Sequence, residues 1–326
     1  MSSAEMGQEF PRHDFINRQG VYEKAPFGQV VTAMVTPFDT SGALSLDKAQ
    51  ELADYLAHNG SEGLVLAGTT GESPALTDIE EISLFRAVRD AVDIPILAGT
   101  GSDNQAEAVD LSRRVAQLGI ADGLLVVTPP YVRPTQSGIK QYYRAIAEAA
   151  PELPLVMYDI PIRTGQGMSE ETTVELAEIP NIVGLKDATG KLPRARSIMA
   201  RTPDDFVLYS GDDKLNLEFA TRGAVGAISV ASHWAGKEIK AMFRALANNN
   251  YPRAQHINDA LQASYKFESS DEARNPVPAK AMMRILDIDV GYCRPPMDLA
   301  NALLDFRVEQ LAEEIYTDLA RLALWQ

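Results

Sequence analysis

The chain has 326 residues, of which 45% are hydrophobic and 23% are charged, and these proportions exclude a fibrous or largely disordered protein. Its 30 Lys and Arg residues against 45 Asp and Glu residues give a formal net charge of −15, which disfavours binding to nucleic acid or to an anionic membrane surface. The single cysteine, Cys293, excludes an intrachain disulfide and a cysteine-based zinc cluster. An anionic substrate would therefore need a local cationic pocket.

The first 28 residues are polar, show no hydrophobic period and contain two prolines. We expect residues 1–28 to form a loose arm outside the fold. They lack the apolar core of a signal peptide, and no run of about 18 apolar residues occurs anywhere in the chain. These features favour a cytoplasmic protein with no segment in a membrane.

From residue 29 to residue 236, short apolar runs alternate with amphipathic runs. The apolar runs lack the alternation of a half-exposed strand, which is typical of a parallel sheet buried on both faces. Their number favours a closed (β/α)8 TIM barrel of the α/β class over an open doubly wound sheet, and no GxGxxG motif follows the first strand. The predicted strands cover residues 30–36, 63–67, 94–98, 123–127, 155–158, 182–186, 206–210 and 226–230. The predicted helices cover residues 46–59, 77–92, 105–118, 137–150, 170–178, 192–201 and 215–222.

After residue 236 the strand signals stop. The pattern of residues 237–326 predicts helices, with breaks at 272–278 and 291–296 where glycine and proline gather. We expect a C-terminal helical domain packed on the barrel.

In a barrel of this kind, the chemistry lies at the carboxyl ends of the strands. The second strand ends in Gly-Thr-Thr-Gly, where Thr69 and Thr70 let backbone N–H groups approach a ligand carboxylate. A tight turn explains this run equally well. The fourth strand ends near Tyr131, which follows two prolines and is either a projecting hydroxyl or a packing aromatic.

The fifth strand ends in Tyr158, and Arg163 follows five residues later. Tyrosine can relay protons and arginine can bind a carboxylate through two hydrogen bonds, although a buried tyrosine beside a solvated arginine is an ordinary alternative. The sixth strand ends in Lys186. A desolvated lysine is a nucleophilic amine suited to a Schiff base with a keto acid, whereas the alternative is a lysine that is ion-paired or extends to solvent.

Together, these strand ends resemble a known family. The runs at 68–72 (GTTGE), 158–163 (YDIPIR), 184–190 (GLKDATG) and 275–280 (NPVPAK) are similar to those of the pyruvate-dependent class I aldolases, which include dihydrodipicolinate synthase and N-acetylneuraminate lyase. The resemblance covers roughly residues 29–297. It implies a TIM barrel with a C-terminal helical domain, as the hydrophobic pattern does independently.

The resemblance also implies catalytic roles. Lys186 corresponds to the Schiff-base lysine and Tyr158 to the central acid and base. Thr70 and Tyr131 correspond to a proton relay in which a neighbouring subunit supplies Tyr131. No metal or organic cofactor is expected, and the four histidines show no ligand spacing.

Substrate binding is implied in the same way. Thr69 and Thr70 correspond to the residues that bind the pyruvate carboxylate, and Arg163 to the one that binds the second substrate's carboxylate. Gly211 and the carbonyl of Ile228 would line the pocket. The reaction implied is condensation of pyruvate with aspartate semialdehyde by a homotetramer built as a dimer of dimers.

Two other functions remain open. N-acetylneuraminate lyase and the 2-keto-3-deoxy sugar acid aldolases use the same fold and lysine, but usually lack an arginine equivalent to Arg163. A non-catalytic barrel that only binds or regulates is a third interpretation, which the set formed by Lys186, Tyr158, Thr70 and Tyr131 disfavours.

The chain departs from the family pattern at several positions. Pro130 stands where a second tyrosine is usual, Val132 where asparagine is frequent, Ile162 where serine or glycine is usual, and His233 near a usual asparagine. The first two bear on the subunit contact, and Ile162 bears on the second substrate.

Regulation is a further expectation from the resemblance. Many members of the family are inhibited by lysine at the dimer interface. Here Asp78 and Glu81 stand where histidine is often found, and Asp103 replaces a frequent asparagine. With Pro130 in place of an aromatic ring, we expect this chain to be insensitive to lysine.

Overall fold

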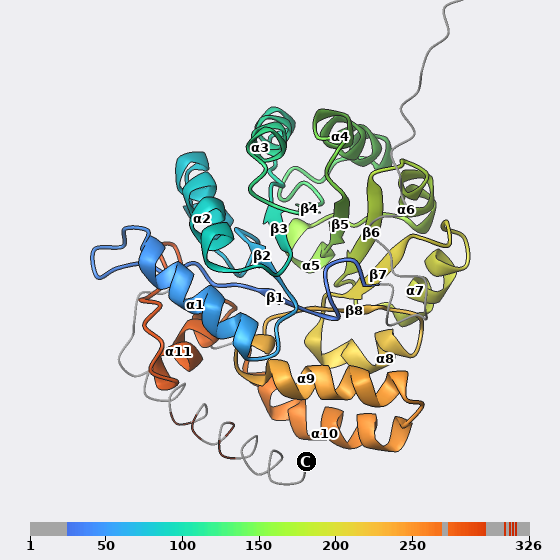
Figure 1. The fold of residues 1–326 in the computed structure, drawn as a ribbon. Coiled ribbons are helices and arrows are strands. Elements are labelled where there is room, and N and C mark those ends of the chain that lie inside the picture. Colours follow the sequence, from blue (N-terminus) through green and yellow to red (C-terminus); the bar gives the residue numbers. More distant parts are fainter. Residues whose placement is uncertain are drawn as a thin grey trace, which may run out of the picture.

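The computed structural model describes residues 25–268 and 273–297, together with Gln310, Glu313, Ile315 and Thr317. Its centre is a closed barrel of eight parallel strands that follow one another in chain order, with helices on the outside (Figure 1). This arrangement confirms the predicted (β/α)8 barrel. The strands are β1 (Val30–Ala33), β2 (Gly63–Leu66), β3 (Ile96–Gly99), β4 (Gly123–Val127), β5 (Leu155–Asp159), β6 (Ile182–Asp187), β7 (Val207–Ser210) and β8 (Gly226–Ser229).

The strands are buried on both sides, as their apolar sequences predict. Alternate residues point into the barrel, where Val156 and Tyr158 join an inner cluster, while Met157 between them packs in the outer layer under the helices. Side chains at successive positions of a strand thus serve different purposes, one lining the barrel and the next meeting a helix.

The last residues of the predicted arm belong to the fold. Phe27 is 2% exposed and packs in the inner cluster, and its backbone N–H donates to the Tyr209 hydroxyl at 3.3 Å. A Cβ atom at Gly123 would lie 2.9 Å from the ring of Phe27, so the barrel leaves room for this ring. Phe27 lies in a polar segment that has no hydrophobic period, so the sequence pattern did not predict that it packs in the barrel. Residues 1–24 lie outside the described residues.

The helices outside the barrel begin and end close to their predicted limits. A capping box starts the helix at Asp78–Ala91, because the Thr77 hydroxyl accepts from the Glu80 N–H and the Glu80 carboxylate accepts from the Thr77 N–H. The helices are α1 (Leu46–His58), α2 (Asp78–Ala91), α3 (Gln105–Leu118), α4 (Gln136–Ala149), α5 (Pro161–Thr164), α6 (Glu170–Ala177), α7 (Leu192–Met199) and α8 (Asn216–Ala220).

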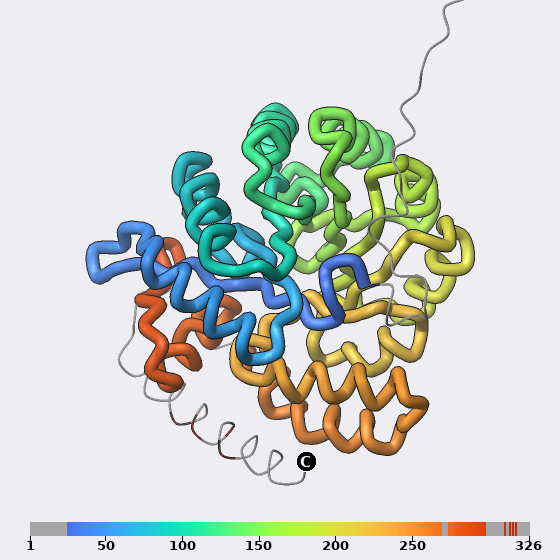
Figure 2. Tube along the Cα trace, in the orientation of Figure 1, coloured from blue at the N-terminus to red at the C-terminus, as the bar shows by residue number. Residues whose placement is uncertain are grey.

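Up to residue 297, the described residues form three further helices after β8. They are α9 (Ser232–Ala247), α10 (Tyr251–Phe267) and α11 (Val277–Ile285), and α9 and α10 lie side by side at one edge of the barrel (Figures 1 and 2). Helix α9 is kinked at Ala235, whose φ of −123° and ψ of 25° are not helical, so the predicted boundary at residue 236 lies beside a break within this helix. Among the described residues, no helix is long and apolar enough to cross a membrane. Most of the predicted helix beyond residue 297 lies outside the described residues.

Candidate active site

A cavity of about 490 Å³ lies over the carboxyl ends of the strands. The C-terminal segment completes its wall with Glu268, Arg274 and Asn275. The cavity collects all the predicted site residues except Tyr131, namely Thr69, Thr70, Tyr158, Arg163, Lys186, Gly211 and Ile228.

Lys186 and Tyr158 occupy paired positions on neighbouring strands β6 and β5, and the Lys186 Nζ lies 4.1 Å from the centroid of the Tyr158 ring. Lys186 is 6% exposed, and burial lowers its pKa to about 8, while the negative charge of Asp213 opposes this shift. The unprotonated amine is therefore a minor form at pH 7, but it is far more abundant than in an exposed lysine, and it is able to attack a carbonyl carbon.

Tyr158 keeps its proton at neutral pH. Burial raises its pKa to about 12, although the positive charge of Arg163 and a hydrogen bond with Thr69 act in the opposite direction. A neutral phenol beside a free amine can donate a proton to a departing hydroxyl and then take one back.

The loop that carries Thr69 and Thr70 is braced by the C-terminal segment. The Asn275 amide donates to the Thr70 hydroxyl oxygen at 2.9 Å. Glu72, which ends the loop with a φ of 58°, is buried and pairs with the Lys280 ammonium at 2.7 Å. Its other carboxylate oxygen accepts from the Arg294 backbone N–H at 2.8 Å. Asn275 and Lys280 belong to the 275–280 motif, but no pattern in the sequence indicates what they contact.

Arg163 lies on the short helix α5 at the mouth of the cavity. It is exposed, and its guanidinium donates to the Asn275 carbonyl at 3.3 Å. The remaining N–H groups of the guanidinium suit a carboxylate at the entrance. Ile162, next to it, is 88% exposed and adds an apolar surface to the same rim.

Gly211 and Ile228 shape the space around the lysine. A Cβ atom at Gly211 would lie 3.0 Å from the Lys186 Cγ, so a larger residue there would displace the lysine. The Gly211 N–H donates to the Asp187 carbonyl at 2.9 Å, which ties β7 to β6 just beyond Lys186. Ile228 is buried on β8 and closes the far side of the cavity.

Tyr131 does not line the cavity in a single chain. It is 87% exposed, its φ is +65°, and its N–H donates to the Thr164 carbonyl at 3.2 Å. The backbone of the loop is thus held to α5, while the ring stands in solvent beside the exposed Val132. A role in the site would require this ring to enter the cavity of another subunit.

His233 is part of the scaffold. It is fully buried, its Nε2 accepts from the Val35 N–H at 3.1 Å, and its Nδ1 lies 2.8 Å from the Val230 carbonyl. Burial lowers its pKa to about 4, so the ring is neutral and joins the ends of β1 and β8.

A second cavity, of about 530 Å³, lies on the other side of Arg163. Its lining includes Asp78, Glu81, Asp103 and Glu107, and Pro130 forms part of its wall. Burial, followed by the charges of Asp78 and Glu80, raises the pKa of Glu81 to about 8, so this carboxyl is largely neutral at pH 7. The cavity is acidic and shares Thr69, Ile160 and Arg163 with the first.

Comparison with known proteins shows similarity over most of the chain. A 4-hydroxy-tetrahydrodipicolinate synthase from Cyanothece sp. is 45% identical over 291 residues, which are 89% of this chain and 98% of the relative. The structure of DHDPS from Cyanidioschyzon merolae with lysine bound has a TM-score of 0.84 and 42% identity, covering 90% of this chain and 98% of the other. A dihydrodipicolinate synthase from Acinetobacter baumannii complexed with pyruvate has a TM-score of 0.83 and 32% identity, covering 89% and 99%. The model of the dihydrodipicolinate synthetase family matches residues 26–313, and the chain belongs to this family.

Proposed function

We propose that this chain condenses pyruvate with L-aspartate 4-semialdehyde to give 4-hydroxy-tetrahydrodipicolinate, in the biosynthesis of diaminopimelate and lysine. The observation that carries the proposal is the buried Lys186, with its pKa near 8, beside the Tyr158 ring in a cavity that has Arg163 at its mouth. Several relatives bear the name of this enzyme. Biosynthetic work of this kind supports a cytoplasmic location.

The first half of the reaction activates pyruvate. The Lys186 amine attacks the keto carbon, Tyr158 donates a proton to the departing oxygen, and water leaves as the imine forms. Thr69 and Thr70, on the braced loop, hold the pyruvate carboxylate. The protonated imine withdraws electrons, so a methyl proton leaves and an enamine results.

The second half joins the acceptor. The enamine carbon attacks the aldehyde of aspartate semialdehyde, whose carboxylate Arg163 binds at the cavity mouth. The acceptor's own amine then attacks the imine carbon, closes the ring and releases Lys186. Thr70 and Tyr131 pass protons between Tyr158 and solvent, and Gly211 and Ile228 leave a narrow space for the growing product.

Assembly is part of the proposal. Tyr131 cannot serve the cavity of its own chain from its exposed position, whereas an adjacent subunit can present it to a partner's cavity. We therefore propose a dimer as the smallest active unit and a tetramer of two dimers as the full assembly. The Cyanidioschyzon merolae relative binds lysine. In this chain, the acidic lining and Pro130 of the second cavity support a form that lysine does not inhibit.

Two measurements test the function. Incubation with pyruvate and borohydride, followed by intact-mass analysis, should show one reduced pyruvyl group per chain, and its absence would favour a non-catalytic barrel. A panel of acceptors should then show turnover with aspartate semialdehyde and not with N-acetylmannosamine or sugar aldehydes. The reverse preference would identify a sugar acid aldolase.

A further inference from the structure

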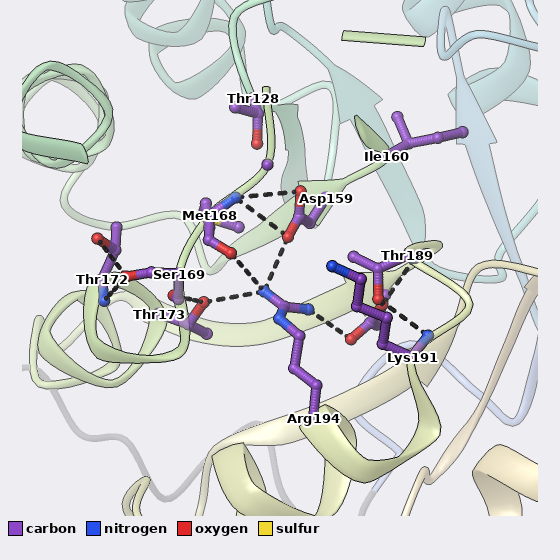
Figure 3. A network of polar contacts seen from close by, with 12 residues as sticks. Thr128, Asp159, Ile160, Met168, Ser169, Thr172, Thr173, Thr189, Lys191 and Arg194 are labelled. Carbon is purple, nitrogen blue, oxygen red and sulfur yellow. Dashed lines mark hydrogen bonds and ion pairs between the residues drawn. The ribbon is translucent and has the colours of Figure 1, made fainter. Parts of the chain in front are cut away.

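A buried arginine joins the two strands that carry Lys186 and Tyr158. The Arg194 guanidinium, on α7, donates to Asp187 at 2.6 Å through one nitrogen and to Asp159 at 2.8 Å through the other (Figure 3). Both carboxylates are 0% exposed and Arg194 is 7% exposed. The second nitrogen also donates to the Met168 carbonyl and the Thr173 hydroxyl, each at 3.3 Å.

The position of the two carboxylates relates this group to the reaction. Asp159 directly follows Tyr158 and Asp187 directly follows Lys186, and the two pairs are in register across β5 and β6. Because successive side chains of a strand point to opposite faces, Tyr158 and Lys186 face the cavity while the aspartates face α7. The guanidinium thus binds the outer side of the two strand ends whose inner side carries the reacting groups.

We propose that Arg194 is a positioning residue that fixes the separation and orientation of Lys186 and Tyr158. This inference rests on the proposed function, since it assigns a purpose to the spacing of those two side chains. The planar guanidinium has two donor edges at a fixed angle, so it sets the distance between Asp159 and Asp187. Each aspartate in turn fixes the backbone of the residue before it.

Other bonds of the two aspartates extend this effect to the loops around the cavity. Asp187 accepts from the N–H and the hydroxyl of Thr189 at 2.8 and 2.7 Å, and Asp159 accepts from the Met168 N–H at 3.3 Å (Figure 3). The segment before Met168 leads back to α5, which carries Arg163. One guanidinium therefore connects the ends of β5 and β6 with the loops that follow them.

A lysine at position 194 separates charge from geometry. Its ammonium preserves the positive charge but is a single point donor that cannot span both carboxylates with a fixed angle. In Arg194→Lys, we expect the rate of imine formation with saturating pyruvate to fall by about 10- to 100-fold, the order that misplacement of a catalytic group produces. The KM for pyruvate should change little, because the groups that Arg194 binds lie apart from the loop of Thr69 and Thr70. Arg196→Lys, at an exposed position of the same helix, is the matched control and should behave like the wild type.

A second variant distinguishes positioning from stability. Arg194→Lys leaves a carboxylate poorly paired in the interior, which lowers stability. Adding Asp159→Asn removes the surplus negative charge, so the double variant should regain its urea unfolding midpoint while imine formation stays slow. If Arg194→Lys does not fold, the rate of imine formation is compared between the double variant and the wild type.

The outcomes are distinct. Recovery of the wild-type rate together with stability, or a wild-type rate in Arg194→Lys itself, would show that Arg194 is only structural. Failure of the wild-type chain to trap pyruvate would overturn the proposed function and this inference with it. Slow trapping in folded variants, with the KM for pyruvate unchanged, supports the positioning role.

Discussion

The floor and the rim of the cavity are built differently. On the floor, Lys186, Tyr158 and Thr70 are each at most 6% exposed and lie at strand ends or on a loop braced by hydrogen bonds. On the rim, Tyr131 and Ile162 are 87% and 88% exposed. The groups that we propose to activate pyruvate are thus complete in one chain, whereas those proposed to bind the acceptor and to pass protons to solvent depend on what covers the rim.

This difference has a physical cause. Floor residues lie at or just beyond the ends of buried parallel strands. The register of the barrel fixes their positions, together with contacts such as the hydrogen bonds from Arg194 to Asp159 and Asp187. Rim residues sit on loops, where only a few backbone bonds, such as the one from Tyr131 to Thr164, set the path. Substitutions on the floor should therefore affect the first substrate, and substitutions on the rim the second substrate or the assembly.

The largest effect should come from the floor. Lys186→Ala removes the amine that forms the imine, so pyruvate trapping should vanish and turnover should fall by several orders of magnitude. Intact-mass analysis after borohydride checks this. Lys191→Ala, at an exposed position on the loop after β6, is the control and should trap pyruvate fully. A pyruvyl group on another lysine of the Lys186→Ala chain would remove Lys186 from the mechanism.

The next effect tests whether the rim needs a second chain. Tyr131→Phe removes one hydroxyl and should lower kcat by about 100-fold or more, as removal of a proton relay does. Mixing Tyr131→Phe with Lys186→Ala subunits should restore part of the activity, because a mixed dimer pairs an intact Lys186 with a neighbour's Tyr131. Tyr251→Phe, an exposed tyrosine on α10, is the control. A fully active monomer by light scattering would contradict the shared site.

Substitutions of Arg163, on the rim, should change the kinetics of the second substrate and not those of pyruvate. Arg163→Ala should raise the KM for aspartate semialdehyde by about 10- to 100-fold, because the substrate carboxylate no longer has a charged hydrogen-bond donor. Borohydride trapping of pyruvate should remain near the wild-type level. Arg163→Lys keeps the positive charge but cannot make two parallel hydrogen bonds, so its KM for aspartate semialdehyde should lie between those of the wild type and Arg163→Ala. Unchanged kinetics with aspartate semialdehyde would instead point to a sugar acid acceptor.

A smaller effect concerns pH. The reactive form of Lys186 is the neutral amine, and its pKa of about 8 lies below that of an exposed lysine because of burial. The rate of imine formation at low pyruvate should therefore rise with pH up to about 8 and then level off. Asp213→Asn removes a charge that raises this pKa, so its midpoint should move to lower pH. A midpoint near that of free lysine would show that the amine is not desolvated.

Much of the floor could be predicted from the sequence. Lys186 and Tyr158 end apolar runs, and a barrel places every strand end at one face, so two side chains 28 positions apart in sequence were expected to meet. The strand limits lie within two residues of those predicted, except that β1 ends at Ala33 and not at residue 36, because buried parallel strands are marked by unbroken apolar runs.

The supports of the floor could not be predicted. Arg194 lies in a short amphipathic helix where an arginine suggests a solvated face, and only the packed structure shows it between Asp159 and Asp187. The pairing of Glu72 with Lys280 joins residues more than 200 positions apart, with no local pattern to mark it. The packing of Phe27 in the barrel could not be predicted either, because no local pattern marks it. The rim was predicted only through the family resemblance, because an exposed loop carries no period that fixes its side chains.

The smallest expected effect is that of added lysine, bound in the second cavity, on the rate of the enzyme. A bound amino acid needs a partner for its carboxylate. Arg163 is a cation in this lining, but it also lines the first cavity, where we propose that it binds the acceptor. The lining also includes Asp78, Asp103 and Glu107, while Pro130 offers neither a hydroxyl nor a broad ring. Carboxylates can attract the side-chain ammonium of lysine, yet they repel its α-carboxylate, and each polar group of the ligand that stays unpaired weakens binding by about 1–3 kcal/mol. We therefore expect millimolar lysine to leave a steady-state assay with pyruvate and aspartate semialdehyde essentially unchanged. Pro130→Tyr, which returns the family's usual ring to the wall, should increase sensitivity if the absence of this ring is the main cause. Half-inhibition of the wild type below about 1 mM, an affinity of at least about 4 kcal/mol, would show that this acidic part of the rim binds lysine in another way.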